Sequence, residues 1–146
     1  MFLPYLSSPY PLYLINLMLM ECPPDIYSFS TQNSNNQLKG LFMFKKKEYD
    51  RWMVEAKRTL ASAYSDLREG YYEWASFKAQ QAAELAVKAI LRGLSFAPIG
   101  HSITKLLREL AENNIKGPKK ILYFAMKLDR NYIALRYPDA YPEGPH

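Results

Sequence analysis

Apolar residues recur along the chain at spacings of three and four from Tyr49 onward, which is the period of an α-helix with one buried face. The first such stripe predicts a helix over about residues 49–69, which Gly70 ends as its C-cap. Its inward positions are Trp52, Ala56, Leu60, Ala63 and Leu67. A second helix is predicted over about residues 72–92, with Trp74, Phe77, Ala82, Leu85 and Ala89 inward. So short a connection between the two helices predicts an antiparallel hairpin.

Two shorter helices are predicted after the hairpin. Ser102 is a natural N-cap for the third helix, whose apolar positions are Ile103, Leu106, Leu107 and Leu110. Pro118 suits the first turn of the fourth helix, and Pro138 ends it. The buried face of this helix is expected to be Ile121, Ala125, Leu128 and Tyr132. Because this region shows no strand-like alternation, the expected fold is all-α, an up-and-down antiparallel bundle of four main helices.

The first forty residues differ in kind from the rest. Residues 1–42 form an irregular, partly apolar extension rich in Pro, Tyr, Ser and Asn, and residues 43–146 form the helical domain. Prolines precede the short apolar run at 13–20, and no basic segment or small-residue cleavage site accompanies it, so neither a membrane span nor a signal peptide is expected. Met43 and Phe44 are followed by three lysines, and Met43 resembles a natural start, so we interpret the extension as a dispensable product of an upstream start codon.

The amino-acid composition limits the kinds of site that the chain can contain. The only cysteine, Cys22, excludes an internal disulfide and a cysteine-based zinc cluster, which favours a cytoplasmic protein. Two histidines, His101 and His146, are too few for a multi-histidine metal site, so no metal and no cofactor are expected. The net charge of +5 permits contacts with phosphate, and it is equally typical of the surface of a helical domain.

A polar stripe runs along the second helix, where Gln81, Glu84 and Lys88 share a face. Glu84 and Lys88 form either an ordinary ion pair worth about 0.3–0.5 kcal/mol, or a pair in which Glu84 holds Lys88 as a phosphate ligand. His101 precedes the third helix, where free amides would help it bind phosphate. Its alternative role is a hydrogen bond to a nearby carbonyl. The two tryptophans fall on apolar stripes and are interpreted as core or interface anchors rather than as base-stacking platforms.

The alanine-rich run at 79–92, His101, and the sequence Arg136-Tyr137-Pro138-Asp139 together resemble the HEPN family of small helical domains. The resemblance extends over about residues 49–142 and implies a helical bundle with a nucleotide- or RNA-related role. A Thr-His-Asp-Leu-like motif of the family corresponds to Gly100-His101-Ser102-Ile103, in which only the histidine and the apolar position are kept.

Catalytic HEPN members resemble metal-independent ribonucleases with an arginine followed, after four to six intervening residues, by a histidine. Arg130-Asn131 matches the start of this motif, but Leu135 and Arg136 stand where the histidine would fall. Arginine cannot exchange protons near neutral pH. We therefore expect no catalytic residue. The alternative is a ribonuclease toxin with a non-standard site that pairs Arg130 with His101 or His146.

The Arg-Tyr-Pro sequence resembles the branch of the family that lacks this histidine. The resemblance implies a homodimer that binds an ATP-like nucleotide and works with a minimal nucleotidyltransferase in a toxin–antitoxin-type system. RNA is a possible second ligand and is not favoured. The implied nucleotide site comprises Gln81, Glu84, Lys88, His101, Arg130, Arg136, Tyr137 and Asp139. Arg136 and Asp139 have a second interpretation, as an ion pair that fastens the tail. A third overall interpretation is a pure oligomerisation unit.

We expect a homodimer in solution. The predicted fourth helix is apolar over residues 121–126, which covers more than one of its faces and calls for cover on more than one side. Light scattering at tens of micromolar, on the full chain and on a chain that starts at Met43, should give twice the monomer mass. A monomeric mass for both chains would rule the dimer out, and a dimeric mass for the shorter chain alone would mean that the extension covers this surface.

Overall fold

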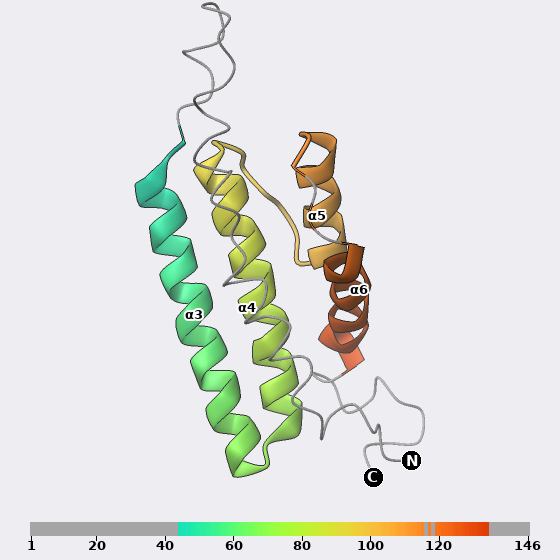
Figure 1. Cartoon of the computed structure of the whole chain (residues 1–146). Coiled ribbons are helices and arrows are strands. Elements are labelled where there is room, and N and C mark those ends of the chain that lie inside the picture. Colours follow the sequence, from blue (N-terminus) through green and yellow to red (C-terminus); the bar gives the residue numbers. More distant parts are fainter. Residues whose placement is uncertain (1–43, 116, 118, 135–146) are drawn as a thin grey trace, which may run out of the picture.

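The computed structural model describes residues 44–115, 117 and 119–134, and α-helices form the greater part of them (Figure 1). The helices are α3 (Lys46–Glu69), α4 (Tyr72–Gly93), α5 (Ile103–Glu112) and α6 (Lys119–Ala134). No strand occurs in these ranges, so the all-α fold class is confirmed. The extension at 1–42 and the expected helix end at Pro138 lie outside the described residues. None of the described helices is both long and apolar enough to cross a bilayer.

The two long helices α3 and α4 form the predicted antiparallel hairpin (Figure 1). Small side chains line their contact and allow the backbones to approach closely, and the buried alanines are Ala56, Ala63, Ala79, Ala82, Ala83, Ala86 and Ala89. Gly70 ends α3 in the left-handed conformation (φ 82°), which glycine adopts without strain. The Lys78 ammonium crosses from α4 to α3, where it contacts Asp66 Oδ2 at 2.6 Å and donates to Ser62 Oγ at 2.9 Å. The hairpin is thus joined by both apolar and ionic contacts.

The connector between α4 and α5 returns along α4 instead of leading away from it. It turns directly after Gly93, with Ser95 at φ 71°, and by His101 it has come back beside Gln80. Gln80 and Gly93 are 13 residues apart in α4, which is about 20 Å at 1.5 Å per residue. Helix α5 therefore starts beside the middle of α4 and runs in the same general direction as α4 (Figure 1). Helices α3 and α4 follow the predicted up-and-down path. Helix α5 does not, because the connector returns along α4 before α5 begins.

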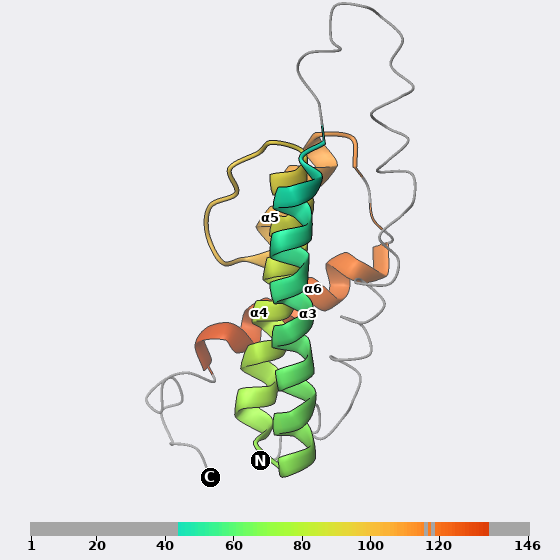
Figure 2. The ribbon, with the colours of Figure 1, turned by 90° about the vertical axis from the view of Figure 1, so that its left-hand side faces the viewer.

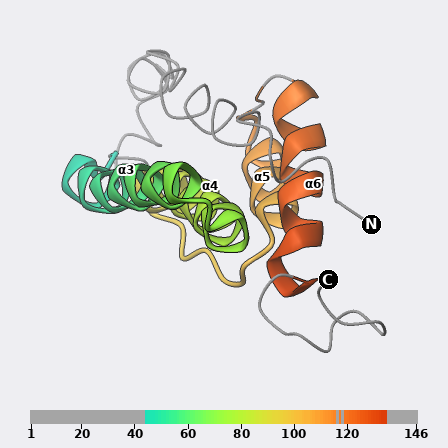
Figure 3. The ribbon, with the colours of Figure 1, turned by 90° about the horizontal axis from the view of Figure 1, so that it is seen from below.

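Helix α6 lies across the hairpin rather than along it, as Figures 2 and 3 show. It contacts both α4 and α5, and it contributes Ala125 and Leu128 to the hydrophobic core. Two other residues of its predicted buried face, Ile121 and Tyr132, are only half-buried. The core is therefore built between α3 and α4 first and is extended by α5 and α6 on one side.

The two tryptophans have different environments. Trp52 is half-buried against the core, with the Arg92 guanidinium 5.3 Å from its ring centroid. Trp74 was predicted to face inward, and this prediction is wrong, because its side chain is 60% exposed. The residue lies in the first turn of α4, next to the end of α3, and its ring packs edge-on against Phe77 instead of entering the core.

The packing between the end of α4 and the start of α3 can be tested directly at Gly93. A β-carbon at this position would collide with the ring of Phe44, although alanine is otherwise the better helix former. We expect Gly93→Ala to lower the free energy of unfolding by about 1–3 kcal/mol through overpacking, measured by urea denaturation. In a Phe44→Ala background the same change should be neutral or stabilising by up to about 1 kcal/mol. Equal destabilisation in both backgrounds would contradict this explanation.

Candidate functional site

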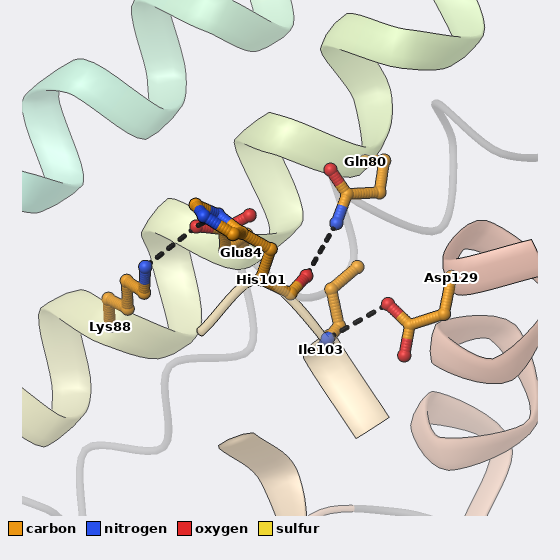
Figure 4. Close-up of polar contacts among 6 residues, drawn as sticks. All are labelled: Gln80, Glu84, Lys88, His101, Ile103 and Asp129. Carbon is orange, nitrogen blue, oxygen red and sulfur yellow. Dashed lines mark hydrogen bonds and ion pairs between the residues drawn. The ribbon is translucent and has the colours of Figure 1, made fainter. Parts of the chain in front are cut away.

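A buried carboxylate on α4 is the centre of the candidate site. The Glu84 side chain is 8% exposed, and its Oε1 accepts a hydrogen bond from the Lys88 ammonium at 2.7 Å. The same oxygen lies 3.2 Å from Nδ1 of His101 (Figure 4). A buried charge needs such partners, because burial removes the water that would otherwise solvate it. The ion pair expected from the Glu84–Lys88 spacing is present, and Lys88 is itself only 11% exposed.

A glutamine that the sequence analysis did not single out holds the backbone of this site. Gln80 is fully buried, and its Nε2 donates to the carbonyl oxygen of His101 at 2.9 Å (Figure 4). Gln81, the predicted residue, is half-buried one position further along α4. Gln80 also shares a face with Glu84 and Lys88, at spacings of four residues, so the signal for it was available in the sequence.

His101 brings together the connector, α4 and α6. Its side chain is 63% exposed, and its ring stacks on Tyr132 of α6 with centroids 5.8 Å apart and planes 16° apart. Tyr132 in turn stacks on Phe77 of α4 at 6.1 Å, and Trp74 meets Phe77 edge-on at 6.2 Å. The orientation of the imidazole is therefore set on one edge by Glu84 and on one face by Tyr132.

The amides at the start of α5 are already occupied. Asp129 of α6 accepts hydrogen bonds from the Ile103 amide through Oδ1 at 2.9 Å and from the Thr104 amide through Oδ2 at 2.9 Å. Its Oδ2 also accepts from Ser102 Oγ at 2.8 Å. These amides were expected to be free to help His101 bind phosphate, but the Asp129 carboxylate occupies them instead. Ser102 is the N-cap as predicted, since its hydroxyl accepts from the Lys105 amide at 3.3 Å.

The remaining predicted residues are not brought to this cluster. Arg130 is exposed, and at 100° per residue it lies 200° around α6 from Tyr132, the residue that contacts His101. Arg136, Tyr137 and Asp139 lie outside the described residues. Within the described ranges, no group of three or more His, Cys, Asp or Glu side chains has the arrangement of a metal site.

The arrangement has a definite chemical character. One imidazole is oriented by a buried acid and remains exposed, while the charge of that acid is balanced by a buried ammonium. No described residue hydrogen-bonds the other ring nitrogen of His101, Nε2. The cluster therefore presents one oriented imidazole edge to the surroundings of the protein, which can donate to or accept from a ligand.

Comparison with known proteins gives one match. A protein-family model described as HEPN domain matches residues 49–145, which is 97 of the 146 residues. Neither a curated protein nor a solved structure matches the chain. The family match covers α4, α5 and α6 in full and α3 from Tyr49 onward, and it agrees with the resemblance stated from the sequence.

Asp129 should be a main determinant of how α5 and α6 are held together. Asp129→Ala removes the acceptor of two amides and one hydroxyl, so we expect a loss of about 2–3 kcal/mol in the free energy of unfolding. Asp50→Ala is the matched control, because Asp50 pairs with Lys46 at an exposed position of α3 and should cost less than about 0.5 kcal/mol. Equal losses in the two variants, measured by urea denaturation, would contradict this role.

Proposed function

The chain belongs to the HEPN domain family, and we propose that it is a non-catalytic member that binds an ATP-like nucleotide through its phosphate and docks a minimal nucleotidyltransferase. The family is compatible with nucleotide-binding and with ribonuclease roles. The choice between them rests on the chemistry of the site and not on the fold.

The observation that carries the proposal is the exposed imidazole of His101 on its buried Glu84–Lys88 support. An imidazole held in this way can donate a hydrogen bond from Nε2 to a phosphate oxygen when it is protonated. The charges of Lys88 and Glu84 balance each other, and the chain as a whole carries a net charge of +5. This net positive charge favours the approach of an anion.

The rest of the proposed nucleotide site comes from the family resemblance. Gln81 would complete the polar edge of α4. Arg130 lies on a different face of α6 from the residue that stacks on His101, so it would contribute a second cation from the other chain of the proposed homodimer. Arg136, Tyr137 and Asp139 would close the site from the segment that follows α6 in the sequence. Their part in the proposal is supported by the Arg-Tyr-Pro sequence alone.

A metal-independent ribonuclease is the alternative, and one observation favours it. The Glu84–His101 contact orients the imidazole as a general base would require. Two observations weigh against it: the sequence lacks the histidine expected after Arg130, and Arg130 lies on a different face of α6 from the residue that stacks on His101. A site that joins Arg130 to His101 would therefore need a second copy of the chain.

The surface of α6 supports a protein interface. Leu122, Tyr123 and Met126 are 39%, 55% and 45% exposed, respectively, and lie together on the side of α6 that the core leaves open. Exposed aromatic and methionine side chains are typical of interface cores. We propose that this face of α6 contributes to the homodimer, and that the nucleotidyltransferase docks on the same assembly.

Calorimetry with ATP tests the nucleotide proposal. His101→Ala removes the exposed donor, so we expect affinity to fall about tenfold to a hundredfold, since a hydrogen bond to a charged group is worth about 1.5–3 kcal/mol. Arg58→Ala is the matched control, because Arg58 is an exposed cation on α3, which does not contact α5 or α6. It should leave affinity within about twofold.

Two results would contradict the proposal. One is the absence of heat at millimolar ATP, with and without a nucleotidyltransferase. The other is metal-free cleavage of RNA that is lost in Arg130→Ala, which would make the chain a ribonuclease. Cleavage that persists unchanged in that variant would instead point to a contaminating nuclease.

A further inference from the structure

We propose that Nε2 of His101 is a nucleophile that accepts a phosphoryl group, so that the chain carries a phosphohistidine at this position. The acceptor would react with small phosphoryl donors whose leaving group departs readily, of which phosphoramidate is the simplest probe. The inference goes beyond nucleotide binding, because it concerns a covalent bond to the protein and does not need ATP.

The two nitrogens of the His101 ring have different surroundings. Nδ1 faces Oε1 of the buried Glu84 at 3.2 Å, so in the neutral imidazole it is the nitrogen that carries the proton and donates it to the carboxylate. The lone pair of the neutral ring then resides on Nε2, at the opposite edge. The side chain is 63% exposed, and no described residue hydrogen-bonds Nε2. The buried acid therefore selects the nucleophilic tautomer and directs it outward.

Three contacts hold the imidazole of His101 and its partner Glu84 in place. Gln80, fully buried, donates to the carbonyl oxygen of His101 at 2.9 Å and fixes its backbone. Tyr132 stacks on the imidazole with planes 16° apart and fixes the plane of the ring. Lys88 holds the Glu84 carboxylate from the side at 2.7 Å. A nucleophile held by its own backbone, a neighbouring ring and a positioned acid loses little freedom when it reacts.

The proposed reaction is a displacement at the phosphorus atom of phosphoramidate. The lone pair of Nε2 attacks the phosphorus of phosphoramidate, a new N–P bond forms, and the original P–N bond breaks. Phosphoramidate reacts in the form whose nitrogen already carries three protons, so neutral ammonia leaves with the electron pair of that bond and no further proton is needed. The imidazole ring becomes positively charged, and its Nδ1 proton stays in the hydrogen bond to Glu84, whose negative charge stabilises the product. Glu84 is thus a positioning residue, and it acts only through His101.

The experiment uses the full chain and compares its two histidines. After incubation with phosphoramidate, peptide mapping by mass spectrometry reads out the gain of one phosphoryl group at His101 and at His146, and acid treatment should remove it. We expect His101 to be labelled about tenfold faster than His146, because Nδ1 of His101 faces the buried Glu84. His101→Asn should abolish this fast phase, and His146→Asn should keep it.

A second variant tests the role of Glu84. In Glu84→Gln the labelling of His101 should slow about tenfold, and nitrogen NMR should show a smaller fraction of the ring protonated at Nδ1. Glu55→Gln, at an exposed position of α3, is the matched control and should change neither quantity. The tautomer is informative because a merely structural role for Glu84 would not move it in a chain that keeps its helical circular dichroism.

Two outcomes would overturn the proposal. The first is labelling of His101 no faster than that of His146, which needs no variant and so does not depend on whether a variant folds. The second is an unchanged rate and tautomer in a folded Glu84→Gln chain. Failure of ATP calorimetry leaves this labelling result intact, and failure of the labelling leaves ATP binding intact, so the two proposals are tested separately.

Discussion

The Asp129 carboxylate on α6 is the contact on which the geometry of the site depends. It receives the amides of Ile103 and Thr104 and the Ser102 hydroxyl, so it fixes where α5 begins. Because α5 begins beside the middle of α4, the connector has to return along α4 by more than three helical turns. That return brings His101 to Glu84. Asp129 of α6 therefore stabilises the contact between His101 in the connector and Glu84 in α4.

The hairpin was the most predictable part of the structure, because its signals are local. Apolar spacing marked α3 and α4, Gly70 marked the turn between them, and Ser102 marked the start of α5, all within three residues of the observed bounds. Long-range contacts were not predictable in the same way. Asp129 and Ser102 are 27 residues apart in the chain, and nothing in the residues around either indicates that they meet. The expectation of free amides failed for this reason.

Within the site, the pattern of residues on α4 was informative but not unique. Each residue turns the helix by 100°, so both Gln80 and Gln81 lie close to the face of Glu84 and Lys88. Only the path of the connector decides which of the two is covered, and it covers Gln80. Trp74 failed for a related reason. Its position fits the apolar stripe of α4, but at that level the buried side of the helix is formed by the next two residues, Ala75 and Ser76, and Trp74 lies on the open side. A stripe of apolar residues therefore did not locate the buried face correctly at this end of α4.

The contacts differ in how far apart their residues lie along the chain, and this difference affects the order in which the protein folds. Contacts between α3 and α4 join helices that are adjacent in the chain, so little loop entropy opposes them and they can form early. The connector, α5 and α6 pack on α4 in the folded protein, and α5 and α6 lie further along the chain. We therefore expect the transition state for folding to contain the hairpin and to lack the cluster around His101. Changes in that cluster would then act mainly by accelerating unfolding, and the candidate site would be the first part of the molecule to open and the last to close.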